Sequence, residues 1–227
     1  MTSSDRSQTN SVFDLDKIEY KVWMRFYEDG IFELFLGVLL LIMGSARLLP
    51  EGALDESRTP FIATMIGFQV LALIAFFLAK RFITYPRIGR VKFGPKGKQR
   101  KRKAAVVLTG SALMGLVIFL LSASLATGRL TLPHPDIFFP SIWAANMLIV
   151  FGLLAHFTGN GRFYLAGFMY AIPLPAIVAF KRLAGFDIAY FAFFLPAIPL
   201  LVVGSIVMTR FVRTYPSLTG NLVDDEI

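Results

Sequence analysis

The sequence predicts an all-α fold, a polytopic bundle of six transmembrane helices with a short amphipathic helix before the first. Of the 227 residues, 56% are hydrophobic, whereas soluble domains contain about 45–50%, and the mean hydropathy is +0.64. The apolar residues form runs of about 20, the length that a helix needs to cross a bilayer. Lys and Arg are concentrated in a few of the segments between these runs, which is the asymmetry that orients a membrane protein.

The N-terminal 30 residues are expected to lie outside the bilayer. Residues 1–12 are polar and predict a disordered tail, without the apolar stretch after a basic start that marks a cleavable signal. Residues 13–30 predict an amphipathic juxtamembrane helix, because apolar side chains recur at helical spacing at Leu15, Ile18, Val22 and Phe26. Its charges are mixed, so packing on its own bundle is favoured over autonomous lipid binding.

Six apolar runs within residues 31–214 predict the membrane-spanning helices. They are Ile31–Leu49, Phe61–Ala79, Ala104–Ala126, Phe138–Phe157, Phe163–Phe180 and Ile188–Met208. The five residues from Thr158 to Arg162 separate the fourth run from the fifth, and they include two glycines and an asparagine, which favour a tight turn. These two runs therefore predict a helical hairpin, and residues 215–227 are expected to form a C-terminal tail.

The basic residues predict the orientation of the bundle. The loop 80–103 contains eleven Lys and Arg and no Asp or Glu, so the positive-inside rule places it in the cytoplasm. With six spans, both termini and the turn at Arg162 then face the same side, and 18 of the 23 basic residues lie inside. Five or seven spans would lose part of this agreement, so we predict both termini in the cytoplasm.

Two predicted cytoplasmic helix ends carry similar sequences. The segment 81–86 reads RFITYP, and the segment 210–216 reads RFVRTYP. Pro is expected to end each helix, while Tyr and Arg are typical of the membrane interface. Convergent helix termination explains the likeness, and a degenerate internal repeat, as in many transporters, is the alternative.

The basic loop predicts contact with the anionic inner leaflet, where each nearby charge contributes about 1 kcal/mol. The residues expected to make this contact are Arg87, Arg90, Lys92, Lys96, Lys98, Arg100, Lys101, Arg102 and Lys103. A topology signal with general lipid attraction is the simplest interpretation, and a specific acidic protein or phosphorylated headgroup is the alternative. Nucleic acid is not an expected partner, because the loop is tethered to a membrane helix and contains no phosphate-binding motif.

Five residues are candidates for a transport path. They are Glu33, Pro173, Pro175, Pro196 and Pro199. Glu33 is the only acidic residue inside a predicted span, and we expect it to pair with Arg25 or a loop cation, with an ion pathway as the alternative. The prolines remove backbone donors and predict kinks in the fifth and sixth helices, which either shape the bundle or expose carbonyls to a cavity.

Small and polar residues within the spans predict close helix contacts. Gly37 and Gly44 share one face of the first span, and Ser111 with Gly115 forms a small-xxx-small pattern in the third. These faces could pack within the bundle or against a partner. Interhelical hydrogen bonds explain the neutral polar residues Gln69, Ser111, Asn146 and Ser205.

No catalytic residue, metal site or cofactor is predicted. The chain contains no Cys and two His, which excludes thiolate chemistry and makes a His-based metal site unexpected. The acidic residues of the outer loops and His134 show no catalytic spacing, and the signatures of intramembrane hydrolases are absent.

Two stretches near the first two spans resemble a pattern in uncharacterised prokaryotic multi-pass membrane proteins. They are Tyr27-Glu28-Asp29-Gly30 before the first span and residues 84–93, TYPRIGRVKF, after the second. The resemblance covers less than half of the chain. It implies a prokaryotic cytoplasmic membrane, the inner membrane of the cell, and no known activity, so no functional residue is carried over.

The leading hypothesis is a non-enzymatic accessory, assembly or regulatory subunit that works through helix contacts and the basic loop. Anionic lipid, another membrane protein or a second copy of the chain would be its partners. The alternative is a small-solute or ion transporter or channel with its path near the fifth and sixth helices. A third hypothesis is an enzyme that holds lipid phosphate through Arg87, Arg90 and Lys92, with Glu28, Asp29 or Glu33 as its base.

Overall fold

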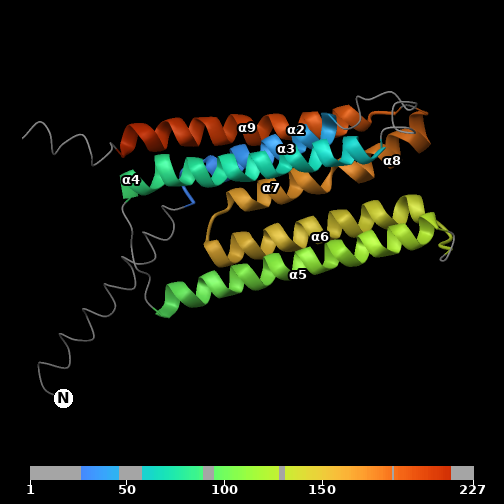
Figure 1. Ribbon diagram of the computed structural model, residues 1–227, viewed down its shortest axis with the longest axis horizontal. Coiled ribbons are helices and arrows are strands. Elements are labelled where there is room, and N and C mark those ends of the chain that lie inside the picture. The colour runs from blue at the N-terminus through green and yellow to red at the C-terminus, as the bar shows by residue number, and fades with distance from the viewer. Residues whose placement is uncertain (1–26, 46–57, 89–94, 128–130, 186, 216–227) are drawn as a thin grey trace, which may run out of the picture.

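The computed structural model describes residues 27–45, 58–88, 95–127, 131–185 and 187–215. Every regular element within these ranges is a helix (Figure 1). The elements are α2 (Ile31–Ser45), α3 (Arg58–Ala79), the π-helical turn η2 (Lys80–Thr84), α4 (Tyr85–Ile88), α5 (Pro95–Ala126), α6 (Pro135–Thr158), α7 (Arg162–Ala171), α8 (Pro173–Ala184) and α9 (Ala189–Thr214). The predicted N-terminal tail, nearly all of the amphipathic helix and the C-terminal tail after Tyr215 lie outside the described residues.

Five helical segments are long and apolar enough to cross a membrane. They are Ala63–Ile88, Arg102–Leu121, Pro135–Thr158, Arg162–Ala184 and Ala189–Thr214. The chain is therefore an all-helical, multi-pass membrane protein in the part described. α2 is shorter, because its 15 residues extend about 22 Å at 1.5 Å per residue. The last residues of the first predicted span, 46–49, lie outside the described residues.

α2 is the centre of the bundle. It packs most extensively against α9 and also contacts α3 and α7, while α6 packs against α5, α7 and α8. Figure 1 shows α2, α3 and α9 together and the α5–α6 hairpin apart from them, with α7 and α8 between. The most deeply buried large apolar side chains are Leu40 of α2 and Leu200 of α9, and the core around them extends to α6 and α7.

Glycines spaced by seven residues bring α2 close to α9. A Cβ on Gly37 would lie 2.7 Å from the Leu201 side chain, and one on Gly44 would lie 3.0 Å from Phe193. The predicted glycine face of the first span therefore packs inside the chain. A Cβ on Gly115 of α5 would meet nothing within 4 Å, so the described part of the bundle leaves this small residue uncovered.

α3 and α5 are the peripheral helices. α3 packs mainly against α2, and α5 mainly against α6. Most of their described side chains are exposed, including Phe77 at 61% and Phe119 at 67%. In a membrane protein such surfaces face lipid or the helix of a partner.

Pro86 does not end the second helix, contrary to the prediction. The helix passes through η2 and continues as α4 to Ile88. A π turn widens the helix and shifts its bonding by one residue, so that Tyr85 donates to the carbonyl of Lys80. This shift relieves the clash of a proline ring with the carbonyl four residues earlier.

The similar segment at the end of α9 ends its helix as predicted. α9 stops at Thr214, and Tyr215 is extended, with φ −119° and ψ 90°, as expected for a residue before proline. Tyr85, by contrast, is helical, with φ −61° and ψ −40°. The two similar segments therefore differ in backbone conformation.

Other helix ends agree only in part with the expected spans. α5 begins nine residues before the predicted third span, so part of the basic loop is helical. The fifth span is divided into α7 and α8 at Ile172, which itself has helical φ −68° and ψ −42°, and α9 continues through Pro196 and Pro199. The α6–α7 turn is tight, as predicted, with Gly159 at φ 71°.

The described segments that were predicted to be cytoplasmic lie at one end of the bundle. The end of α3 and the α6–α7 turn both bond to the segment before α2, and Glu28 of that segment shares a pocket with the end of α9. Lys103 near the start of α5 lies over the ring of Phe157 at the end of α6. At the other end, Arg182 of α8 pairs with Asp136 of α6.

Candidate functional site

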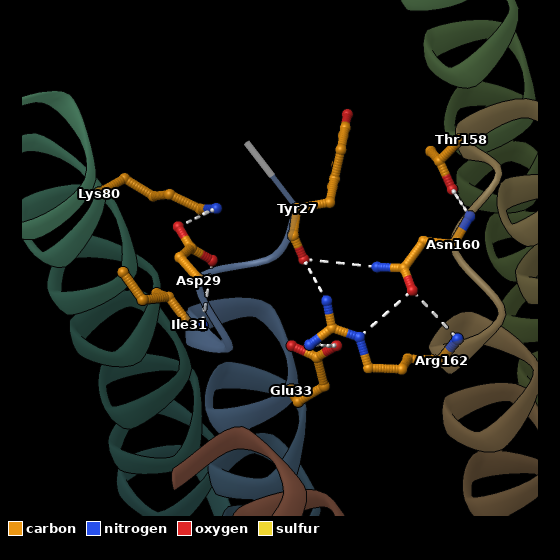
Figure 2. Close-up of polar contacts among 8 residues, drawn as sticks. All are labelled: Tyr27, Asp29, Ile31, Glu33, Lys80, Thr158, Asn160 and Arg162. Atoms are coloured by element: carbon orange, nitrogen blue, oxygen red, sulfur yellow. Dashed lines mark hydrogen bonds and ion pairs between the residues drawn. The ribbon is translucent and has the colours of Figure 1, made fainter. Parts of the chain in front are cut away.

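A cluster of charged and polar side chains is buried at the end of the bundle where the segment before α2 meets η2 and the α6–α7 turn (Figure 2). Its members are Tyr27, Asp29, Glu33, Lys80, Thr84, Thr158, Asn160 and Arg162. We call these eight residues the polar cluster. They come from three segments that are far apart in the sequence, 27–33, 80–84 and 158–162.

Asp29 is the centre of one half of the polar cluster and is completely buried. Its Oδ2 accepts hydrogen bonds from Lys80 Nζ at 2.6 Å and from Thr84 Oγ1 at 2.5 Å. Its Oδ1 accepts from the amide of Ile31 at 3.2 Å, which satisfies one of the free donors at the start of α2. One carboxylate thus caps α2 and ties it to η2.

Gly30, next to Asp29, lies directly against α9. Gly30 has φ +74°, and a Cβ there would lie 2.4 Å from the carbonyl oxygen of Gly204. A Cβ on Gly204 would in turn lie 2.8 Å from the amide nitrogen of Leu34. The two glycines therefore allow the backbones of α2 and α9 to touch, and this contact buries the start of α2.

Arg162 is the centre of the other half of the polar cluster. Its Nη2 donates to the carbonyl of Tyr27 at 3.0 Å, and its Nε donates to Oδ1 of Asn160 at 3.3 Å. Its Nη1 lies 3.3 Å from Oε1 of Glu33. Asn160 Nδ2 donates to the same Tyr27 carbonyl at 3.3 Å, so the α6–α7 turn holds the segment before α2 by two side chains.

The tyrosine of the polar cluster is neutral at physiological pH. Burial raises the pKa of Tyr27 to about 12, because removal from water disfavours the phenolate. Its ring packs edge-on against Phe163 of α7, with 5.9 Å between the ring centroids. Tyr27 therefore adds an aromatic contact to the hydrogen bonds at the α6–α7 turn.

The polar cluster contains two ion pairs, Asp29 with Lys80 and Glu33 with Arg162, and its formal charges cancel. The side chains of Asp29, Lys80 and Glu33 are only 0%, 6% and 4% exposed. Charges buried to this extent are tolerated only when they are paired and hydrogen-bonded. Within the described residues, Oε2 of Glu33 accepts no hydrogen bond and Nη1 of Arg162 donates none. The Glu33–Arg162 pair is therefore less completely hydrogen-bonded than the Asp29–Lys80 pair.

The polar cluster can join helices. Its charged groups, however, already bond to other groups of the chain and are not free to act on a substrate. The carboxylate of Asp29 accepts three hydrogen bonds, and Arg162 donates to the side-chain oxygen of Asn160 and to the carbonyl of Tyr27. In the part of the chain that the structure describes, no group of three or more His, Asp or Glu could hold a metal ion. The polar cluster is best understood as a set of contacts that holds α2, α3 and the α6–α7 hairpin together, and we call this role a lock.

The predicted lipid-contact residues fall into three groups. Arg87 donates from Nη1 to the carbonyl of Ile83 at 2.9 Å, and Arg102 and Lys103 are exposed at the start of α5. Arg90 and Lys92 lie outside the described residues. Only the helical backbone is described for the remaining four, Lys96, Lys98, Arg100 and Lys101. Their contact with anionic lipid stays a prediction.

Among the predicted transport residues, Glu33 lies apart from the prolines of the fifth span. Glu33 pairs with Arg162 at the end of the bundle, and Pro173 lies eleven residues further along the fifth span, or about 16 Å of helix. Pro173 and Pro175 cannot donate to the carbonyls four residues before them. Close to these carbonyls, the indole Nε1 of Trp143 donates to the carbonyl of Tyr170 at 2.9 Å.

Trp143→Phe is expected to destabilise the fifth span. The change keeps an aromatic ring but removes the donor to the Tyr170 carbonyl, a partly buried bond, so we expect a cost of about 0.5–1.5 kcal/mol. Thermal unfolding in detergent would measure the loss. Tyr164→Phe, which changes a 58% exposed side chain of α7, serves as the control and should have no effect. Equal stability of Trp143→Phe and the unchanged protein would contradict the role of this bond.

Sequence reasoning missed most of the polar cluster. Lys80 and Arg162 entered only as topology signals, and Thr84 and Asn160 only as parts of a helix end and a turn. One signal could have suggested the two ion pairs: acidic and basic residues lie at span ends that were all predicted to be cytoplasmic. Which acid meets which base depends on the packing of three helices, and periodicity along one helix does not determine it.

Comparison with known proteins does not assign the chain to a family. The resemblance of residues 27–30 and 84–93 to prokaryotic membrane proteins stays a prediction. No family model, no curated protein and no solved structure matches the chain, so its function is argued from its own residues.

Proposed function

We propose that the protein is a non-enzymatic accessory or assembly subunit of the prokaryotic cytoplasmic membrane that binds the helix of a partner along α3. The observation that carries the proposal is an exposed amide in the middle of an exposed helix. Gln69 of α3 is exposed and lies eleven residues from both Arg58 and Lys80, or about 16 Å of helix in each direction. This spacing puts Gln69 near the middle of the bilayer.

Lipid is a poor neighbour for the side chain of Gln69. Hydrocarbon offers neither donors nor acceptors, so an amide facing it loses its hydrogen bonds to water without replacement. The residues around it on α3 are apolar and exposed, including Ile66 at 55% and Leu73 at 43%. A partner helix with a polar side chain at the same depth would satisfy the amide and cover these residues.

The proposal includes six crossings with both termini in the cytoplasm. It is supported by the gathering of the segment before α2, η2, the α6–α7 turn and the end of α9 at one end of the bundle. The basic start of α5 lies at the same end, as the positive-inside rule requires. Under this topology α2 would be the first of the six crossings, and the basic loop would meet anionic lipid or a cytoplasmic part of the partner.

Gln69→Leu is expected to weaken retention of the partner. The protein would be extracted gently from its native membrane, and native mass spectrometry would identify what remains bound. An interhelical hydrogen bond of about 0.6–2 kcal/mol predicts an affinity for the partner that is about 3- to 30-fold weaker, and a correspondingly smaller bound fraction.

Gln99→Leu is the control for this experiment. It makes the same chemical change at an exposed position near the start of α5, away from the middle of the span. A partner retained equally by both variants, or a chain extracted alone with only lipid, would contradict the proposal. The second outcome would favour the alternative function, a transporter or channel, and solute flux through Glu33 variants would then be the next measurement.

A further inference from the structure

A pocket of about 470 Å³ opens beside the polar cluster, between the segment before α2, the start of α7 and the last turns of α9. Three charged side chains line it: Glu28, Arg162 and Arg210. Its apolar wall includes Ile206 and Phe211 of α9. The volume is in the range of small-molecule sites, about 300–1,000 Å³, and both charged and apolar side chains line the pocket.

The position of the pocket fits a lipid headgroup. Arg162 is the first residue of the fifth span, and Arg210 lies near the end of the last, so both guanidinium groups are at the depth where a span meets the headgroups. Ile206, one turn closer to the middle of the membrane, is 63% exposed. An acyl chain could therefore follow α9 past Ile206 while its headgroup occupies the pocket.

The charges of the pocket favour a zwitterion over an anion. Arg162 is held in place by Asn160 and the Tyr27 carbonyl and already has Glu33 as a counter-charge. Arg210 then offers the remaining positive charge, and Glu28, an exposed acid of the same pocket, offers a negative one. An anionic headgroup would gain from Arg210 but would also meet the carboxylate of Glu28.

We propose that this pocket binds a phospholipid whose headgroup carries both a phosphate and a primary ammonium group, the chemistry of phosphatidylethanolamine. The phosphate lies against Arg210, whose guanidinium group forms charge-assisted hydrogen bonds with it. The ammonium donates to Glu28. The site is separate from the basic loop and does not depend on a partner at α3.

The proposal is tested by titrating the delipidated full-length protein in detergent with single lipids and counting the bound copies by native mass spectrometry. The lipids are phosphatidylethanolamine, phosphatidylcholine and phosphatidylglycerol with identical acyl chains. Phosphatidylethanolamine is expected to bind about tenfold more tightly than the others, because a charge-assisted hydrogen bond has about that effect. The methylated ammonium of phosphatidylcholine cannot donate to Glu28, and phosphatidylglycerol has no ammonium group.

Variants separate the two halves of the headgroup. Glu28→Gln is expected to abolish the preference for phosphatidylethanolamine over phosphatidylcholine, and Arg210→Gln to weaken both about tenfold. Arg213→Gln, on the next turn of α9 and outside this pocket, is the control and should change neither. Thermal unfolding of each variant shows whether it is folded.

Three results would overturn the proposal. Phosphatidylglycerol binding as tightly as phosphatidylethanolamine would show an anionic-lipid surface in place of a zwitterion site. Equal losses in Arg210→Gln and Arg213→Gln would show general attraction to α9. Soluble phosphoethanolamine binding as tightly as the lipid would show that the acyl chain along Ile206 contributes nothing, and that the ligand is a free phosphoamine.

Discussion

Asp29→Asn is expected to lower the free energy of unfolding by about 3–5 kcal/mol, the usual cost of removing one member of a buried ion pair. Asn can still accept a hydrogen bond from the amide of Ile31, so the cap of α2 is largely kept. What is lost is the counter-charge of Lys80, whose side chain is only 6% exposed. An ammonium group in such a site keeps its desolvation cost without the compensating attraction.

The measurement is thermal and denaturant unfolding of the purified protein in a mild detergent, followed by tryptophan fluorescence. Asp136→Asn is the matched control. It makes the same change in the ion pair with Arg182, in which both side chains are about half exposed, and surface pairs contribute little. The control should unfold at the temperature of the unchanged protein, while Asp29→Asn should unfold well below it.

A double variant tests whether the loss comes from the ion pair itself. Asp29→Asn combined with Lys80→Met removes both charges, and replacing a buried pair by uncharged groups is often nearly neutral. We expect the double variant to recover most of the stability that Asp29→Asn loses. Losses that simply add would show that the two side chains are not coupled, and the polar cluster would then not act as a lock.

The fold could be predicted where a single segment carries the information. The apolar runs located the long helices because about 20 apolar residues in sequence have few alternatives to a membrane span. The turn at Gly159 could be predicted because glycine and asparagine accept the left-handed conformation that the structure has there. The glycine face of α2 could also be predicted from one segment, since Gly37 and Gly44 are seven residues apart.

The polar cluster could not be predicted, because its contacts join segments up to 135 residues apart in the sequence. Several basic residues were predicted at the same end of the bundle as Asp29, and the sequence does not show which of them pairs with it. Its partner Lys80 lies in the π turn that follows α3, and the sequence did not predict this turn because Pro86 indicated a helix end. The exposure of Gln69 also required the structure, because sequence alone gave an intramembrane amide no position relative to its neighbours.

Gly30→Ala is expected to be as damaging as the loss of the ion pair, by about 2–5 kcal/mol. Two effects contribute to this estimate. The left-handed conformation of Gly30, with φ +74°, costs a residue with a Cβ about 1–2 kcal/mol, and overpacking costs about 1–3 kcal/mol. The new Cβ would lie 2.4 Å from the carbonyl oxygen of Gly204, which is backbone and cannot rotate away.

Two further variants separate these effects and provide the control. Gly204→Ala adds a Cβ 2.8 Å from the amide nitrogen of Leu34, but Gly204 lies in helix α9 and has no positive φ, so its loss measures overpacking alone. Gly115→Ala adds a Cβ with nothing within 4 Å and should be neutral or stabilising by up to about 1 kcal/mol, the helix propensity gained.

The three glycine variants also test how the polar cluster is held. If α2 and α9 must touch to bury Asp29, Gly204→Ala should unfold at a lower temperature although it changes no residue of the polar cluster. Its loss should shrink when Asp29→Asn has already weakened the lock, because the two changes disturb the same contact. A stable Gly204→Ala beside an unstable Gly30→Ala would mean that backbone strain alone makes Gly30 necessary, and the close contact of α2 with α9 would then not be what buries the ion pair.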